Sequence, residues 1–260
     1  MIVYKSTPEV EKMRQAGRIV ADTIDAVLAA VAPGKTTMDL DVVAEAYIRE
    51  RGATPSFLGY GRPPFPASIC TSVNDEIVHG IPSPKRVLKD GDLLSLDFGA
   101  IWESFHADSA VTVFVGEPPS AEAEKLVRVT EESLEAGIAQ IRPGGRLSDI
   151  SHAVEQTVLG AGFEVVREYV GHGIGRSLHE DPQIPNYGAP GRGPELRPGL
   201  VIAIEPMVNL GGWETRVLAD DWTVVTEDGS LSAHFEHTIA VTDDGAEVLT
   251  ARGEPPTIRA

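Results

Sequence analysis

The sequence predicts an α+β fold: a curved, mostly antiparallel sheet built from two pseudo-symmetric halves, with helices on one face and carboxylates on the other. Three observations support it. Each half begins with two amphipathic helical segments, strand-like runs of alternating polarity follow, and the motifs of the first half recur in the second. The halves cover residues 7–115 and 120–245, and we expect one domain over residues 1–260.

Two helices open the first half. The segment TPE at residues 7–9 supplies an N-cap, a proline at the first helical position and an acid in the first turn. Apolar residues then recur at helical spacing as far as Val31, and the Pro-Gly pair at 33–34 is expected to end this helix. A second helix is predicted from Thr37 to Arg51, with Gly52 as its stop.

Two strand-like runs within residues 93–113 carry one aspartate each. If Trp102 and Glu103 form a two-residue hairpin loop, Asp97 lies directly opposite Asp108, with Cβ atoms roughly 5 Å apart. Like charges that close in an apolar sheet require a proton or a cation between them. A metal site is therefore one hypothesis, and two unrelated solvated aspartates are the alternative.

The chain also contains an internal repeat. The matched segments are VAPGKTTMDLD with IRPGGRLSDIS, HGI at 79 with HGI at 172, LKDGDLLSLD with LRPGLVIAIE, and HADSAVTV with HFEHTIAV. This alignment places Asp97 on Glu205 and Asp108 on Glu236. Chance similarity of short apolar strands explains one such match, but four matches in the same order indicate a duplication.

Strand alternation places these four carboxylates on one face of the sheet. The opposite face is apolar and is expected to carry the helices; it comprises Leu94, Leu96, Val111, Val113, Ile202, Ile204, Ile239 and Val241. Two insertions distinguish the second half. Residues 184–199 are predicted to form a long ordered loop, and residues 209–230 to add a hairpin that bears Trp222.

Composition narrows the function classes. A net charge of -17 and no basic face disfavour direct nucleic-acid binding. The single cysteine, Cys70, fits a reducing compartment. No signal core and no run of about 20 apolar residues is present, so we expect a cytoplasmic protein without a membrane span. No exposed heptad calls for a partner, and we expect a monomer.

Four converging carboxylates with an imidazole nearby suit a pair of divalent ions roughly 3.5–4 Å apart. Such a pair lowers the pKa of a bridging water and clamps both oxygens of a tetrahedral intermediate. Such a site is typical of metal-dependent hydrolases.

Asp97 and Asp108, together with the segments HGIGRSLHEDP, IEPM and FEHTIAVT, give the chain a family resemblance. From Thr7 to about Leu249 it resembles the methionine aminopeptidases of the pita-bread fold. It is similar to the short bacterial type I form, because no further domain precedes the first helix and Glu205 follows His172 by only 33 positions.

The resemblance implies roles for individual residues. The metal ligands would be Asp97, Asp108, His172, Glu205 and Glu236. Glu205 would also move a proton from water to the leaving amine, His179 would hydrogen-bond the scissile carbonyl and oxyanion, and His79 would contact the amide nitrogen. For the two histidines of HGIGRSLH, a pair of ordinary loop histidines is the alternative, and for His79 a structural role.

The resemblance also implies a methionine pocket lined by Tyr60, Phe65, Cys70 and Trp222, where a thioether finds favourable aromatic contacts. Plain core positions are the alternative for the last three. The loop at 60–65 is two residues longer than in many relatives, Phe65 stands where tyrosine is common, and Leu178 replaces a frequent phenylalanine.

The resemblance thus implies a single catalytic domain that removes initiator methionine from nascent proteins whose second residue is small. Its cofactors would be two divalent ions, Co, Mn, Fe or Zn, and its partners nascent N-termini, met in transient proximity to the ribosome. One rival is a prolidase-like X-Pro peptidase of the same fold. A rival of another class is a non-catalytic binding protein on this fold.

Overall fold

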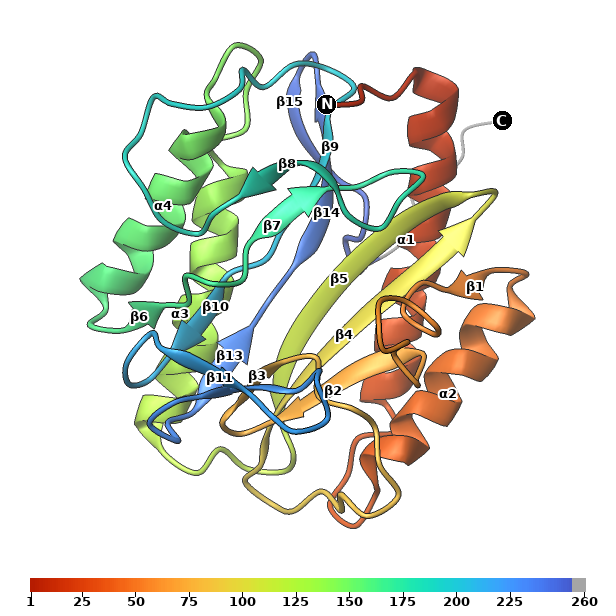
Figure 1. Ribbon diagram of the computed structural model, residues 1–260, viewed down its shortest axis with the longest axis vertical. Helices are drawn as coiled ribbons and strands as arrows, with labels where there is room; N and C mark the ends of the chain where they lie inside the picture. The colour runs from red at the N-terminus through yellow and green to blue at the C-terminus, as the bar shows by residue number, and fades with distance from the viewer. Residues whose placement is uncertain (254–260) are drawn as a thin grey trace.

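The computed structural model describes residues 1–253 (Figure 1). Its helices are α1 (Thr7–Leu28), α2 (Thr37–Glu50), α3 (Ala121–Ile138) and α4 (Leu147–Gly160). Its strands are β1 (Thr54–Pro55), β2 (Ile69–Val73), β3 (Glu76–Val78), β4 (Leu93–Trp102), β5 (Phe105–Phe114), β6 (Glu164–Val165), β7 (Gly171–Gly173), β8 (Glu180–Ile184), β9 (Val201–Ile204), β10 (Met207–Asn209), β11 (Thr215–Val217), β12 (Val224–Thr226), β13 (Ser232–His234), β14 (His237–Thr242) and β15 (Gly245–Val248).

The helices begin where their capping residues predict. Ser6 caps α1, whose Glu9 side chain accepts from the Ser6 backbone, and Thr36 forms the same capping box with Asp39 on α2. In the second half, Ser120 accepts from Ala123 at the start of α3. The prediction for the end of α1 was wrong, since the helix stops at Leu28, before Pro33-Gly34. A separate turn spans the gap.

The hairpin of β4 and β5 has a different register from the one predicted. The loop is Glu103-Ser104, and Trp102 pairs with Phe105. Both loop residues have positive φ, 46° and 70°, as a tight hairpin turn that matches strand twist requires. Asp97 therefore pairs with Ala110, and Asp108 lies two positions away along its strand, diagonal to Asp97 and not opposite to it. The observed register differs from the predicted one by two residues, and a shift of two residues keeps both aspartates on one face of the sheet.

The second half repeats this hairpin in a broken form. Strand β9 pairs with β14 and β10 with β13, both antiparallel. The interruption falls at Glu205-Pro206 on one strand and at Phe235-Glu236 on the other. Proline has no N–H to continue the ladder, so the sheet bends where Glu205 and Glu236 lie. Hydrogen bonding divides the expected single sheet into four sets of strands.

A pseudo-symmetric seam joins the halves. Ala110 N–H donates to the Glu236 carbonyl at 3.3 Å, and Glu236 N–H donates to the Ala110 carbonyl at 3.0 Å. Two positions along, Thr238 Oγ1 accepts from Asp108 N–H at 2.9 Å and donates to the Asp108 carbonyl at 2.8 Å. At the centre, Ser109 Oγ lies 3.3 Å from His237 Nδ1. The seam thus runs through two of the predicted metal ligands.

The apolar face carries the helices as predicted. Leu94, Leu96 and Ile202 are fully buried in one cluster with Ile24 of α1 and Ile150 of α4. Figure 1 shows α1 and α2 flanking one half of the sheet system and α3 and α4 the other. No helix within residues 1–253 is both long and apolar enough to cross a bilayer.

Both insertions have the predicted form. Residues 185–200 contain no strand, and β11 pairs with β12 to make the added hairpin. Strand β12 also pairs with β3 of the first half. Trp222 lies in the loop of this hairpin, which brings it across to the first half of the chain.

Candidate functional site

One cavity on the charged face contains every residue that the sequence analysis selected. Its lining combines the carboxylates, three histidines and a group of apolar side chains: Phe57, Tyr60, Phe65, Cys70, His79, Asp97, Asp108, His172, Leu178, His179, Glu205, Trp222 and Glu236. The residues come from both halves, so the cavity forms only when the two halves associate across the seam.

Asp108, His172 and Glu236 form one close group of donor atoms in the cavity. One ligand atom from each lies within 4.8 Å of the other two, and all three side chains are buried. His172 Nε2 is also 3.5 Å from Glu205 Oε1 and 3.9 Å from Asp108 Oδ2. This spacing lets several donor atoms reach a common ion.

The carboxylates lack partners that would compensate their charge. Asp97 Oδ1, Asp108 Oδ1 and Glu236 Oε1 are buried, and none has a hydrogen-bond partner. Burial raises the pKa of Asp97 to about 7. Burial, reinforced by the neighbouring carboxylates, raises the pKa values of Asp108, Glu205 and Glu236 well above their ordinary range. The donor set therefore fits divalent cations, which neutralise buried carboxylates and prefer oxygen and imidazole ligands.

His172 is held in the form that a metal requires. Its Nδ1 lies 2.9 Å from the Gly173 carbonyl, which fixes the proton on that nitrogen and directs the Nε2 lone pair at the carboxylates. Burial lowers the His172 pKa to about 3, so the imidazole is neutral. The register shift between His172 and Gly173 in β7 turns this residue toward the cavity.

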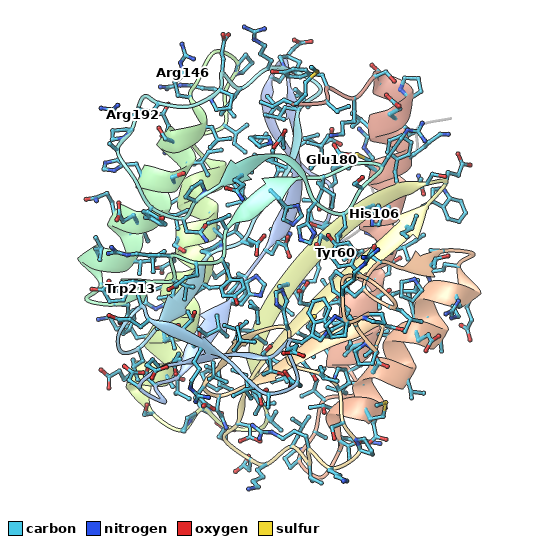
Figure 2. All side chains as sticks on the ribbon, viewed as in Figure 1. Tyr60, His106, Arg146, Glu180, Arg192 and Trp213 are labelled. Carbon is cyan, nitrogen blue, oxygen red and sulfur yellow. The ribbon has the colours of Figure 1, made fainter. Side chains whose placement is uncertain are left out.

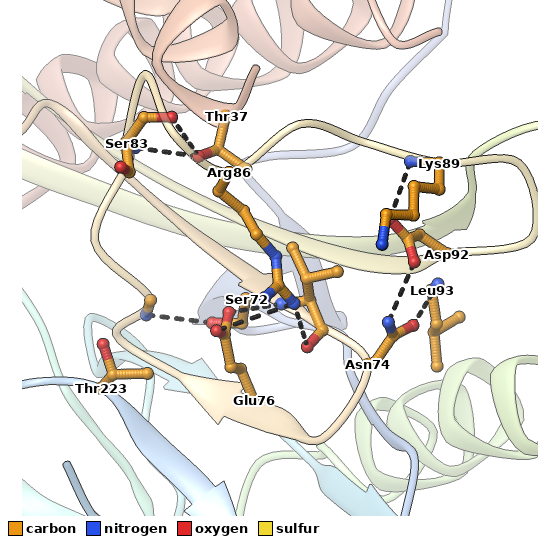
Figure 3. A network of polar contacts seen from close by, with 12 residues as sticks. Thr37, Ser72, Asn74, Glu76, Ser83, Arg86, Lys89, Asp92, Leu93 and Thr223 are labelled. Carbon is orange, nitrogen blue, oxygen red and sulfur yellow. Dashed lines mark hydrogen bonds and ion pairs between the residues drawn. The ribbon is translucent and has the colours of Figure 1, made fainter. Parts of the chain in front are cut away.

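His79 follows β3 and has a φ of 60°, a conformation that side-chain-bearing residues rarely adopt. The next residue, Gly80, packs so tightly on β2 that a Cβ there would lie 2.2 Å from the Thr71 carbonyl oxygen. Gly80 N–H donates to Ser72 Oγ at 3.1 Å. Ser72 is part of the polar network shown in Figure 3.

The same network fixes the turn between β2 and β3. Asn74 donates to Asp92 at 3.0 Å and accepts from Leu93 N–H at 2.9 Å, while Glu76 accepts from Val73 N–H at 2.7 Å. The conformation of His79 is thus imposed by its neighbours. Its ring lies edge-on to Trp222, with centroids 5.9 Å apart.

His179 also lines the cavity. Its ring contacts that of His172 with centroids 4.3 Å apart, and the Tyr60 hydroxyl is hydrogen-bonded to its Nδ1. With Nδ1 paired in this way, Nε2 is the nitrogen that can face a ligand.

The apolar end of the cavity is aromatic. Phe65 and Trp222 meet edge to face with centroids 5.2 Å apart, and Cys70 is buried beside Asp97. Burial raises the Cys70 pKa well above its usual value, so the thiol stays protonated. Gly61 lies so close to Trp222 that a Cβ would approach the indole to 2.5 Å, which explains a glycine in this loop.

Sequence reasoning missed several neighbours of the site. His234 is 2% exposed, its Nε2 has no hydrogen-bond partner, and that atom lies 4.0 Å from Glu205 Oε2. Its alternation with Glu236 on one face was the available signal. Phe57 lines the cavity, and Tyr169 packs on His79 with centroids 5.8 Å apart. No motif marks either of these aromatic residues.

Comparisons with known proteins agree with this geometry. The model of metallopeptidase family M24 matches residues 11–243. Methionine aminopeptidase 1 of Bacillus subtilis is 55% identical over 96% of this chain and 99% of its own length. The crystal structure of methionine aminopeptidase from Thermotoga maritima superposes with a TM-score of 0.94 at 48% identity, over 97% of this chain and 100% of that one.

A more distant solved structure shares the fold alone. Prolidase from Pyrococcus furiosus gives a TM-score of 0.78 at 22% identity, and the match covers 97% of this chain and 66% of the prolidase. The pita-bread fold is therefore shared with a protein named as a prolidase.

Proposed function

This chain is a metallopeptidase of family M24 and belongs to its methionine aminopeptidases, and we propose that it removes the initiator methionine from nascent proteins whose second residue is small. The observation that carries the proposal is the joining, in one cavity, of uncompensated buried carboxylates with an aromatic pocket. The carboxylates suit a metal-dependent hydrolysis, and the pocket suits a flexible thioether side chain.

We assign two divalent ions to Asp97, Asp108, His172, Glu205 and Glu236. When bound, such ions supply Lewis acidity toward a carbonyl and lower the pKa of water. The ligand set accepts Co, Mn, Fe or Zn, because carboxylates and imidazole suit all four. The buried oxygen atoms that lack partners support this assignment.

The protein's own groups do the remaining work. Glu205 carries a proton from water toward the leaving amine, a role that suits a carboxylate placed among the assigned ligands. His179 donates from Nε2 to the carbonyl oxygen as negative charge develops there. His79 contacts the amide nitrogen; burial lowers its pKa to about 4, so it acts as a neutral imidazole.

The methionine side chain would lie among Tyr60, Phe65, Cys70 and Trp222. Aromatic edges and a protonated thiol offer a thioether dispersion contacts without a charge to compete with. The free α-amine of the substrate would lie toward the carboxylates, which explains cleavage at the first residue only.

Residues 1–260 would act as one catalytic domain, since both halves contribute ligands. The partners would be nascent N-termini, encountered in the cytoplasm close to the ribosome. A net charge of -17 makes that encounter transient, because an acidic surface is repelled by ribosomal RNA. We propose that the enzyme is a monomer, because each copy contains a complete set of the assigned residues.

A peptide assay tests the proposal. Purified protein supplied with Mn or Co should release methionine from Met-Ala-Ser, release far less from Met-Leu-Ser, and lose activity in chelator. His179→Ala should lower kcat by about 100-fold or more, the usual effect of losing an oxyanion donor. The control His152→Ala changes a residue of α4 that does not line the cavity and whose Nδ1 is hydrogen-bonded to the Gly188 carbonyl at 3.2 Å, so this variant should keep activity.

The two rivals predict other outcomes. Release of proline from X-Pro dipeptides would support a prolidase-like specificity on this fold. A metal-loaded protein that binds peptide without cleaving it would support a binding protein. Either result would contradict methionine removal.

A further inference from the structure

A buried ion pair lies behind the loop that carries His179. Lys5 Nζ is 2.8 Å from Glu180 Oε2, and the two side chains are 2% and 13% exposed. Every other Lys or Arg ion pair within residues 1–253 has at least one side chain exposed by 35% or more. Charges withdrawn from water this far are costly unless each compensates the other. The pair is thus an unusual feature of this protein.

The lysine is fixed by backbone contacts. Lys5 N–H donates to the Gly199 carbonyl at 2.7 Å, and Lys5 Nζ also donates to the Val3 carbonyl at 3.1 Å. Gly199 has a φ of 87°, and a Cβ there would lie 2.6 Å from the Lys5 carbonyl oxygen. The segment before α1 therefore lies directly on the turn that leads into β9, the strand that Glu205 follows.

Glu180 fixes the loop between β7 and β8, which carries His179. Glu180 is the first residue of β8 and follows His179 directly. Its Oε1 accepts from Ser177 N–H at 3.2 Å, which closes the end of the loop. A Cβ on Gly175 would lie 2.5 Å from Lys5 Cε and 2.6 Å from Glu180 Oε1, so the loop backbone packs against the ion pair itself.

The same loop is tied to the first half of the protein. His106 N–H of β5 donates to the Gly175 carbonyl at 2.8 Å. Figure 2 shows Glu180 and His106 close together where the loop between β7 and β8 passes the end of β5. The loop is thus held between β5 on one side and the Lys5–Glu180 pair on the other.

We propose that Lys5 and Glu180 are positioning residues for His179, a role that rests on the oxyanion role proposed above for that histidine. Tyr60 sets the rotation of the His179 ring, but the ion pair sets where its backbone lies. Without Lys5, the Glu180 carboxylate would turn toward water and release Ser177 and Gly175. A displacement of about 1 Å at a catalytic group can cost roughly 100-fold in rate.

Kinetics of metal-loaded variants test the proposal. Lys5→Met should lower kcat by about 10-fold to 100-fold with KM changed by less than about 3-fold, because His179 acts mainly on the transition state. Lys5→Arg, which keeps the charge, should restore most of kcat. Glu180→Gln keeps the shape and should resemble Lys5→Met.

Lys12→Met is the matched control. Lys12 is also an N-terminal lysine with a carboxylate partner, Glu103 at 3.0 Å, but the two side chains are 39% and 55% exposed. Exposed pairs contribute little, so this variant should match the wild type in kcat and KM. If Lys12→Met loses as much activity as Lys5→Met, the effect is general and the proposal is wrong.

A spectroscopic readout separates positioning from activity. In the zinc-loaded protein, the imidazole NMR signals of His179, assigned with His179→Gln, should shift and broaden in Lys5→Met and return in Lys5→Arg. Unchanged His179 signals and unchanged kcat in Lys5→Met would overturn the proposal. A wild type that releases no methionine would instead overturn the proposed function, and the NMR comparison would still decide whether the pair positions His179.

Discussion

At the scale of single residues, the protein places carboxylates where they cannot all be ionised without cations. The pKa of Asp97 illustrates this effect. Its pKa in the folded protein is about 7, against an ordinary value of 3.8. Between these pH values the metal-free folded state binds a proton that the unfolded state has lost. The folded state is therefore destabilised as pH rises through this window.

Asp97→Asn should reverse this effect in metal-stripped protein. The variant and the wild type should have similar free energies of unfolding near pH 4. The variant should gain relative stability by about 1.4 kcal/mol for each pH unit up to about pH 7, and keep that gain at pH 8. Urea denaturation across this pH range measures it. With metal bound, the sign should invert, because the variant has lost a ligand.

Asp228→Asn is a control for which the effect on stability should depend on pH in the opposite direction. Hydrogen bonds from Ser230, and from the backbone of Gly212, lower the Asp228 pKa below its ordinary value. Its carboxylate therefore stabilises the folded state above that ordinary value and stops doing so as pH falls through the lowered one. A stripped Asp97→Asn protein no more stable than the wild type at pH 8 would contradict the buried charge assigned to Asp97.

At the scale of elements, the seam between β5 and the segment 236–238 positions two of the proposed metal ligands by backbone hydrogen bonds. Thr238 alone satisfies both the N–H and the carbonyl of Asp108. Since Thr238 is fully buried, water cannot replace these bonds. This pairing depends on a hydroxyl that both accepts and donates a hydrogen bond.

Thr238→Val should therefore lower the free energy of unfolding, although the volume of the side chain hardly changes. Two buried backbone groups of Asp108 lose their partner, at about 1–3 kcal/mol each, and metal affinity should fall because Asp108 is freed to shift. Calorimetry and metal titration measure the two effects. The control Thr157→Val removes only a helix back-bond to Ala153 and should cost less than about 1 kcal/mol. Equal effects of the two variants would contradict the role of the seam.

At the scale of the whole molecule, the proposed ligand set couples metal binding to the association of the two halves. Asp108 and Asp97 belong to the first half, and His172, Glu205 and Glu236 to the second. An ion that binds only the folded arrangement stabilises both halves together.

Removing metal should therefore lower Tm and broaden the unfolding transition. An ion present at 100 times its Kd stabilises the fold by about 2.7 kcal/mol. Differential scanning calorimetry of loaded and chelated protein measures the change, and in His172→Ala the difference should shrink. A Tm that chelator leaves unmoved in the wild type would show that the site does not bind metal under those conditions.

The sequence predicts the helices, the repeat and the faces of the strands, because these features depend on local periodicity and capping. It also selected the residues that line the cavity, through the repeat and the resemblance. It did not determine the pairing of Asp97 with Asp108. A shift of two residues preserves every side-chain face, and only the positive φ values of Glu103 and Ser104 choose between the registers.

How distant segments meet depends on the folded arrangement of the whole chain. His234 beside Glu205, Tyr60 on His179 and Lys5 against Glu180 join residues that no periodicity relates. Such contacts depend on where the broken strand at Pro206 bends and on how the seam aligns the halves. The chemistry of the site could thus be expected from residue types in order, while its geometry required the folded chain.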